Sequence, residues 1–468
     1  MSSLETRQTA EVAAAAALSQ LDRRPLPVGA EGTVGGSLVE FSVFDAMDPA
    51  LREQLVSDET PFADRCKGAM LGMAVGDAVG SQVEFLEVGS GEAAFDAEGC
   101  CYTGSVRNMF GFKPGQWTDD TSMGLCLADS LLCCGKFDGS DFMARLWNWN
   151  HLAYNNGFRY DLDRAGDEAT RAFMIDAGLD ADACRQSLGC GRGTRSTLAN
   201  LEEGAAPPAV HEGGEYEGNG SLIRLAPVPV FCARQSAEEC MAVARASALA
   251  TQNGPVTSEA AAFLVFVMRR AILRGEDARS FREFLDDAIM EYSAMLTPRA
   301  DEAAVAAVLK LLASAEDEAS TEVCWNWRSD ELDVLKAFAN RGESYNGHQV
   351  KKDYFGAYAM DGLAVALWAA YHADSPTAAI AKATNVLGDA DSMACIAGQL
   401  AGSFYGARSF DPRLVAQLRQ WDPDCETELR GVLLSHCGAP PPHTHEGGRA
   451  STHGGGLHQY HLCQPQRC

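Results

Sequence analysis

Two short clusters of acidic and hydroxyl residues, far apart in the sequence, each stand directly before a helical pattern. The first is Thr118–Asp120 and the second is Gly388–Ser392. After the second cluster, apolar residues recur at spacings of three and four, which predicts a helix. Free backbone N–H groups and the helix macrodipole favour negative charge at such helix starts. The candidate metal-binding residues are Thr118, Asp119, Asp120, Asp389, Asp391 and Ser392.

Neither cluster contains Cys or His, which disfavours zinc and favours a hard cation. Mg²⁺ binds oxygen ligands in octahedral geometry and usually keeps several waters. Four carboxylates and two hydroxyls exceed what one Mg²⁺ needs and suit two ions, with Mn²⁺ as an alternative metal. A plainer reading is that Thr118, Asp119 or Asp389 only caps its own helix. Carboxylates that converged without a cation would repel one another, so convergence would favour metal binding.

The segments that must position these clusters read as helices. Residues 67–84 carry Gly or Ala at many positions, which is poor for an isolated helix but suits close packing against neighbouring backbones. Strand-like alternation is rare and no fixed repeat period is present. We therefore predict an all-α, compact multi-helix fold. The predicted helices are 121–134, 141–150, 168–177, 238–250, 257–274, 279–293, 301–314, 359–372, 376–383, 393–405 and 413–420.

Composition divides the chain into three parts. Residues 1–60 include a Gly-rich run at 29–36 and are predicted to be a flexible leader with one short helix around 11–21. Residues 61–437 are the predicted catalytic domain. Residues 438–468 are a low-complexity His/Gly/Pro tail, for which a disordered tail is the favoured reading over a metal-binding tract.

The formal net charge of −26 argues against a nucleic-acid partner, because such binding needs a basic surface. No apolar run is long enough to span a membrane, and the N-terminus lacks the pattern of a secretory signal. The 16 Cys include no Cys-x-x-Cys pair and several fall inside apolar patterns, which indicates a reducing compartment. We expect a cytoplasmic monomer, with a nuclear or mitochondrial location left open.

Five motifs in order resemble those of the ADP-ribosyl-glycohydrolase family, which includes the dinitrogenase-reductase-activating glycohydrolase and the eukaryotic ADP-ribosylhydrolases. The resemblance covers residues from about 65 to 407. One such motif would be weak, but five in the family's order make a specific match. The motifs are 68–80, 116–120, 218–227, 361–368 and 388–406.

The resemblance implies an orthogonal all-α fold with two Mg²⁺ ions in a central cleft. One ion would be held by Thr118, Asp119, Asp120 and Asp391, and the other by Asp389, Asp391 and Ser392. The catalytic residues would be Glu84, Asp120 and Asp391, with Glu84 at the position of a flexible glutamate of the family. The implied substrate-binding residues are Asp77, Tyr216, Gly218, Asn219, Gly220, Ser221 and Gln252.

Some positions depart from the family. Gln252 stands where many members have His, so that position can donate a hydrogen bond but cannot act as a titrating imidazole. Tyr216 is a candidate to stack on adenine, whereas Tyr358 begins an apolar helix and is predicted to pack in the core. An acidic insert at about 313–350 has no counterpart in the family. Its Trp325 and Trp327 either cover the rim of the cleft or pack inside.

The function that this resemblance implies is Mg²⁺-dependent hydrolysis of the glycosidic bond between ADP-ribose and a protein side chain or small acceptor. The partner would be an ADP-ribosylated protein or an ADP-ribose-containing small molecule. The first alternative is a non-catalytic ADP-ribose-binding or structural, crystallin-like protein on the same fold, because fold does not guarantee activity. The second is a different two-metal hydrolase such as a phosphoesterase. The sequence leaves open whether the bond is to arginine, serine, poly-ADP-ribose or O-acetyl-ADP-ribose.

Overall fold

The architecture comes from a computed structural model of the chain. It describes residues 3–26, 28, 41–106, 108, 110–161, 187–202, 207–209, 216–275, 279–300, 302–341, 344–345, 348–349 and 354–437. The Gly-rich run at 29–36, the predicted helix 168–177 and the tail 438–468 lie outside the described residues.

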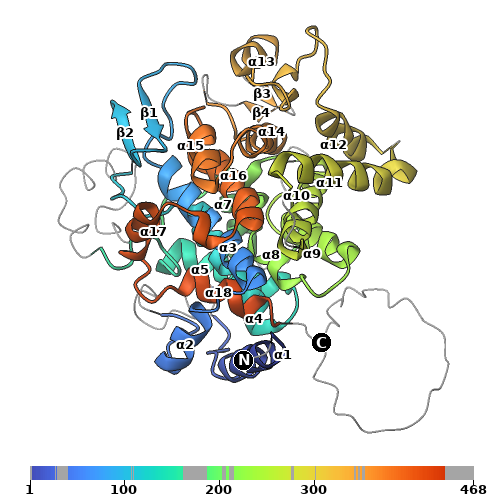
Figure 1. Ribbon diagram of the computed structural model, residues 1–468. Coiled ribbons are helices and arrows are strands. Elements are labelled where there is room, and N and C mark those ends of the chain that lie inside the picture. The colour runs from blue at the N-terminus through green and yellow to red at the C-terminus, as the bar shows by residue number, and fades with distance from the viewer. Residues whose placement is uncertain are drawn as a thin grey trace, which may run out of the picture. The chain divides into compact units, whose positions relative to one another are not determined.

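The described chain is helical with two small hairpins, which confirms the predicted all-α class (Figure 1). The first half of the helices is α1 (Ser3–Ser19), α2 (Pro49–Val56), α3 (Pro61–Gly80), α4 (Asp119–Cys134), α5 (Gly139–Leu152), α7 (Arg192–Glu202), α8 (Pro227–Phe231), α9 (Ala237–Leu249) and α10 (Pro255–Leu273). The second half is α11 (Phe281–Leu296), α12 (Ala303–Ala313), α13 (Val334–Arg341), α14 (Ala359–Tyr371), α15 (Pro376–Thr384), α16 (Ala390–Tyr405), α17 (Pro412–Arg419) and α18 (Glu426–Leu434). The antiparallel hairpins pair β1 (Ala93–Asp96) with β2 (Cys101–Gly104) and β3 (Ser344–Tyr345) with β4 (His348–Gln349).

Every predicted helix that falls in the described residues coincides with an observed one, with ends that differ by a few residues. The sequence missed α2, α7, α8, α13 and α18. Two of these are easy to explain, because α7 follows a Gly-rich run and α8 contains two prolines, both of which weaken a helical pattern.

Helices α3 and α16 pack antiparallel with their backbones in contact, side by side at the centre of Figure 1. Each glycine of a stripe on α3 meets the backbone of α16 so closely that a Cβ would overlap it. A step of four residues forward along α3 matches a step of four backward along α16. The facing pairs are Gly68 with Gly402, Gly72 with Gly398, Gly76 with Ala394, and Gly80 with Ala390. The predicted close packing of the small-residue segment is thus confirmed, and the start of α16 lies beside the end of α3.

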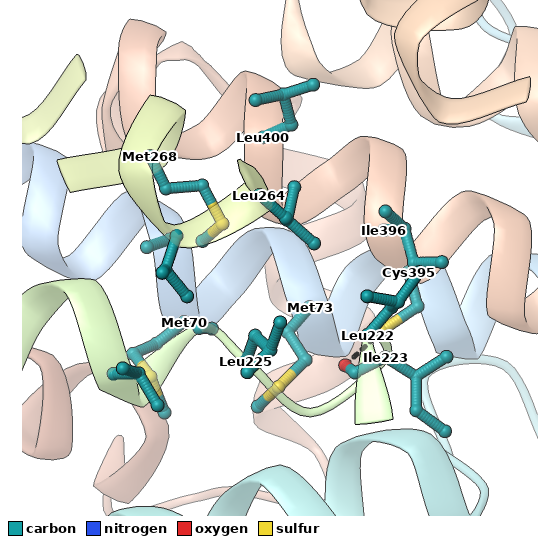
Figure 2. Packing of buried hydrophobic residues seen from close by; sticks show 14 of the residues in the cluster. Met70, Met73, Leu222, Ile223, Leu225, Leu264, Met268, Cys395, Ile396 and Leu400 are labelled. Atoms are coloured by element: carbon teal, nitrogen blue, oxygen red, sulfur yellow. Dashed lines mark hydrogen bonds between the residues drawn. The ribbon is translucent and has the colours of Figure 1, made fainter. Parts of the chain in front are cut away.

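Apolar side chains on the other faces of this pair form the core. Figure 2 shows side chains from α3, α10 and α16 gathered around the segment 222–225. The Cys395 thiol donates a hydrogen bond to the carbonyl oxygen of Ile223 at 3.1 Å, drawn as the dashed line in Figure 2. This core holds the segment that follows Gly218–Ser221 against α16. The labelled side chains are Met70, Met73, Leu222, Ile223, Leu225, Leu264, Met268, Cys395, Ile396 and Leu400.

The N-terminal part differs from the predicted flexible leader in its described residues. Helix α1 is longer than the expected short helix, and α2 was not expected. Ala14, Ala17, Val43 and Phe44 are fully buried in the main core, and α1 and α2 contact α18. Alanine side chains are small, so the apolar pattern of α1 is weak in the sequence. The same small side chains can nevertheless be fully buried against a close neighbour.

The two tryptophans of the insert pack inside rather than covering the cleft. Trp325 donates from Nε1 to Asp361 at 3.0 Å, and Trp327 donates from Nε1 to the carbonyl oxygen of Leu311 at 2.9 Å. Both rings are buried. Tyr358 is also buried, as predicted for a core residue.

In the described part of the chain, none of the helices has the length and apolar character needed to cross a bilayer. The described cysteines are all free thiols.

Candidate active site

Asp77, near the end of α3, holds the start of α4. Its carboxylate accepts hydrogen bonds from the Thr118 backbone N–H at 3.0 Å, the Thr118 hydroxyl at 2.9 Å and the Thr121 N–H at 2.9 Å. Burial raises the pKa of Asp77 to about 6. The side chain is fully buried and is not among the residues that line the cavity described below. The contacts of Asp77 in the structure are thus with the α4 start, and its role as a substrate contact stays a prediction.

Five carboxylates from three places in the sequence converge on one cavity of about 220 Å³. One carboxylate oxygen from each of Glu84, Asp389 and Asp391 lies within 4.8 Å of the other two. The Thr118 hydroxyl lies 3.5 Å from Asp391 Oδ2, which links the two predicted acid clusters directly. The five carboxylates belong to Glu84, Asp119, Asp120, Asp389 and Asp391.

The turn before α16 aims Asp389 and Asp391 into this cavity. Leu387 and Gly388 both have positive φ, at 68° and 69°. The Gly388 N–H donates to the carbonyl oxygen of Leu86 at 3.0 Å, and Asp389 N–H donates to that of Phe355 at 2.8 Å. Three segments are thereby joined at the turn, and the acids that follow face the space between them.

The capping alternative is correct for one residue and wrong for another. The Thr118 hydroxyl accepts from the Asp120 N–H at 3.4 Å, so Thr118 does cap α4. The Asp389 side chain makes no capping bond to α16. Its oxygens instead accept from the Asn219 amide at 2.7 Å and the Tyr354 hydroxyl at 2.9 Å. Asp389 is held in place by other segments, and its carboxylate faces the cavity.

The carboxylates are buried together with little compensating positive charge. Burial, followed by the charges of neighbouring carboxylates, raises the pKa of Glu84, Asp120 and Asp391 well above their usual values. Burial, with the charge of Asp77 next, does the same to the pKa of Asp119. Among the residues that line the cavity in the described chain, the exposed Arg192 is the one basic side chain.

Two buried carboxylate oxygens in this cluster have no hydrogen-bond donor, namely Glu84 Oε2 and Asp120 Oδ2. Unpaired buried carboxylate oxygens are costly unless a cation or a donor meets them. Hard oxygen ligands crowded without basic neighbours suit Mg²⁺ or Mn²⁺. The donor set therefore fits a divalent cation, and the buried acidic cluster could hold one.

Most of the predicted substrate-binding residues line the same cavity, namely Tyr216, Gly218, Asn219, Gly220 and Gln252. Ser392, a predicted metal ligand, also lines it. Ser221 does not, since it is fully buried. Thr118 does not line the cavity itself, and its hydroxyl contacts a lining residue, Asp391.

A chain of hydrogen bonds fixes the orientation of Gln252. The buried Arg224 donates to the Thr251 hydroxyl at 2.6 Å, and that hydroxyl lies 2.5 Å from Gln252 Oε1. Arginine can only donate, so the threonine oxygen accepts from it and its own hydrogen is directed to Gln252. The Gln252 amide nitrogen then faces Gly220, where a Cβ would lie 2.7 Å from it.

The sequence interpretation missed Tyr354 and the segment 189–194. Tyr354 lies in no motif and gave no local signal. The segment lines the cavity with Gly189, Gly191, Arg192, Gly193 and Thr194 and leads into α7. Gly189 has φ 88°, and a Cβ there would overlap the Asp119 carboxylate. Alternating glycines after a break could have indicated this close approach.

The fold and the site define a class of protein: an all-α protein in which the starts of helices bring buried carboxylates to one cavity. A profile described as ADP-ribosylglycohydrolase matches residues 58–439, and the chain belongs to the ADP-ribosylglycohydrolase family. The resemblance seen in the five motifs is thus confirmed, and with it the enzyme class, a hydrolase acting on glycosyl bonds.

Two relatives are named ADP-ribosylarginine hydrolase Tri1. The one from Pseudomonas putida (strain GB-1) is 30% identical over 363 residues, covering 76% of this chain and 74% of the relative. The one from Serratia proteamaculans (strain 568) is 27% identical over 358 residues, covering 74% and 73%. A third, the ADP-ribosyl-[dinitrogen reductase] glycohydrolase of Rhodospirillum rubrum, is 24% identical and covers 78% of this chain and 93% of the relative.

Proposed function

We propose that this protein removes ADP-ribose from ADP-ribosylated arginine side chains of proteins, with Mg²⁺ as its cofactor. The observation that carries the proposal is the convergence of five buried carboxylates on one cavity, where the exposed Arg192 is the one basic side chain among the described lining residues. The arginine linkage is supported by the two relatives named as ADP-ribosylarginine hydrolases.

In this proposal, Thr118, Asp119, Asp120 and Asp391 hold one Mg²⁺ ion, and Asp389, Asp391 and Ser392 hold a second. When bound there, the ions would supply positive charge that orients the hydroxyls of the ribose and makes water a better nucleophile. Asn219 keeps Asp389 in place by its 2.7 Å hydrogen bond, and Asp77 keeps Thr118 in place. The protein's share of catalysis is positioning and electrostatic stabilisation.

The proposed reaction is attack by water on the anomeric carbon of the ribose. An O–C bond forms, and the C–N bond to the guanidine breaks with its electron pair going to nitrogen. Glu84 takes the proton that the water releases and passes it to the leaving guanidine, so the products are ADP-ribose and arginine. Glu84 suits this role because it lines the cavity and its Oε2 has no hydrogen-bond donor. Asp120, whose Oδ2 also lacks a donor, is the alternative acceptor.

The remaining cavity residues are suited to the ADP part of the substrate. Tyr216 lies against two glycines, since a Cβ on Gly193 or Gly218 would come 2.8 Å from Tyr216 Cε1. Its ring can stack on adenine. The Gly-rich backbone at Gly218 and Gly220 can donate N–H groups to phosphate oxygens, and Gln252 adds a neutral donor beside it.

The test is release of free ADP-ribose from a panel of arginine-linked, serine-linked, poly- and O-acetyl-ADP-ribose substrates, with Mg²⁺, Mn²⁺ or EDTA. We expect turnover of the arginine-linked substrate, lost in EDTA. Replacing a residue that only orients a metal ligand typically lowers activity about 10- to 100-fold. Asp391 is a proposed ligand itself, so Asp391→Ala should lower activity at least about 100-fold. Asp287→Ala, at an exposed ion pair, is the matched control and should retain full activity.

Two outcomes would contradict the proposal. Full turnover by Asp391→Ala would exclude the metal-binding role of that carboxylate. ADP-ribose binding without turnover of any substrate would instead support the non-catalytic alternative.

A further inference from the structure

Tyr354 lies between two carboxylates of the site and touches both. Its hydroxyl is 3.1 Å from Glu84 Oε1 and 2.9 Å from Asp389 Oδ1. Its ring stacks on that of Phe85, the residue after Glu84, with ring centroids 5.3 Å apart and planes at 16°. Tyr354 therefore contacts the segment that carries Glu84 twice, once through the hydroxyl and once through the ring.

The backbones around this contact are joined to one another. Phe85 has a positive φ of 65°, and its N–H donates to the carbonyl oxygen of Gly388 at 2.9 Å. The Gly388 N–H in turn donates to the carbonyl oxygen of Leu86 at 3.0 Å. The residue after Tyr354, Phe355, accepts from the Asp389 N–H at 2.8 Å. The backbone of each segment is thus held, and what remains to be set is the direction of the Glu84 side chain.

Among the described residues, Tyr354 is the one hydroxyl that donates to the Glu84 side chain, whose other close polar neighbour is the Asp391 carboxyl group, and Glu84 Oε2 has no donor. Asp389, in contrast, has a second donor in Asn219. A phenol carries one hydrogen and can give it to only one carboxylate at a time. Asp389 can release the Tyr354 hydrogen without losing its support, whereas Glu84 cannot.

We propose that Tyr354 is a positioning residue that holds the Glu84 carboxylate at the cavity beside Asp389. In this role Tyr354 acts through the Glu84 carboxylate. The effect of Tyr354 on the reaction rate rests on the proposed function, because the direction of the Glu84 side chain affects a rate only if Glu84 takes part in hydrolysis. The structural part, that Tyr354 sets where the Glu84 carboxylate lies, does not depend on the reaction.

The test compares Tyr354→Phe, Glu84→Gln and the double variant with the wild type. Phenylalanine keeps the ring stack on Phe85 and removes only the hydroxyl. Tyr371→Phe is the matched control, since its hydroxyl also donates to a carboxylate, Asp286 Oδ2 at 3.0 Å, and neither residue lines the cavity. The measurements are kcat and KM for an ADP-ribosylated arginine peptide, Kd for ADP-ribose by calorimetry, and crystal structures of the wild type and Tyr354→Phe.

We expect Tyr354→Phe to lower kcat by about 10- to 100-fold, the range typical of residues that orient a functional group, with Kd within about threefold. In the Glu84→Gln background the same change should cost less than about twofold, because residues that act as a unit are not additive. The Glu84 carboxylate should leave its place in the Tyr354→Phe crystal structure. Tyr371→Phe should match the wild type throughout.

Three results would overturn the inference: unchanged kcat in Tyr354→Phe, an equally large loss in the Glu84→Gln background, or a Glu84 carboxylate that stays in place without the hydroxyl. A wild type that hydrolyses nothing would defeat the proposed function. In that case the crystal structures alone still decide the inference, because they report the place of Glu84 and no rate.

Discussion

Gly72 on α3 and Gly398 on α16 face each other at a crossing that leaves no room for a side chain on either. A Cβ at Gly72 would overlap the carbonyl oxygen of Gly398, and a Cβ at Gly398 would overlap that of Gly72. This contact belongs to the stripe that runs antiparallel along both helices. The stripe sets which residue of α16 lies beside the end of α3, and so brings Asp391 close to Thr118 and Glu84.

Gly72→Ala should destabilise the protein strongly. The added Cβ meets backbone, which cannot rotate away, so the helices must separate and weaken the packing around them. Overpacking of this kind costs about 3 kcal/mol at the upper end of its usual range. The measurement is urea unfolding, with Gly275→Ala as the control because a Cβ at Gly275 meets nothing within 4 Å. Equal stability of both variants would show that the helices are not in backbone contact.

Asp77→Ala should lower stability rather than only weaken substrate binding. The change leaves the Thr118 and Thr121 N–H groups buried without their acceptor. An unsatisfied buried donor costs about 1–3 kcal/mol, so a loss of about 2 kcal/mol or more is expected in chemical denaturation. Asp77→Asn keeps one acceptor oxygen and should recover part of this loss. A substrate contact would behave differently, with a raised KM and unchanged stability.

Divalent metal should stabilise the protein more as pH rises. In Glu84, Asp119, Asp120 and Asp391 the folded-state pKa lies well above the usual values of 4.5 and 3.8, because of burial and then neighbouring charge. Without a cation, the stability from these groups is therefore present below about pH 4 and is lost as pH rises through the raised pKa values.

A cation binds the deprotonated cluster and offsets that loss. Thermal unfolding in EDTA and in Mg²⁺, from pH 5 to 8, measures the effect. At a hundredfold excess of Mg²⁺ over its Kd the gain should be about 2.7 kcal/mol. A metal effect that did not change with pH would place the binding outside this cluster.

Asp129→Asn should be among the most destabilising polar substitutions. Arg430 of α18 donates to both Asp129 oxygens, at 2.8 and 3.1 Å, and both side chains are buried. Burial alone would raise the pKa of Asp129, but Arg430 together with Arg145 and Asn155 outweighs it and the pKa is lowered. Breaking a buried ion pair by removing one partner costs about 3–5 kcal/mol.

The pH dependence of this pair has the opposite sign to that of the cavity cluster. A lowered folded-state pKa contributes stability that is present above the usual value of 3.8 and is lost as pH falls through the folded value. The stability difference between Asp129→Asn and the wild type should therefore begin to shrink below about pH 4 and disappear as pH falls through the folded-state pKa. Asp287→Asn, in the exposed pair with Arg279, should change stability by less than about 1 kcal/mol at any pH.

Local patterns predicted much of this molecule correctly. Apolar spacing along the chain identified most helices between α4 and α17, though not α7, α8 or α13, and the acids at two helix starts identified four of the five carboxylates that line the cavity. The same local patterns failed for α1, whose alanines are too weakly apolar to indicate burial, and for α8, whose prolines argue against a helix. The motif around Asp77 did not reveal that its carboxylate accepts from Thr118 and Thr121, because a motif shows that a residue matters and not which atoms it meets.

The sequence by itself determined the helical class, the family and the oxygen-only side chains of the acid clusters, because residue types and near-neighbour spacing carry that information. Only the tertiary structure decided that Asp389 is held by Asn219 and Tyr354 rather than capping α16. It also decided which turn of α16 meets the end of α3. A shift of one helical turn would move Asp391 by about 5.4 Å and separate it from Thr118. Contacts between distant segments depend on packing, which no local spacing records.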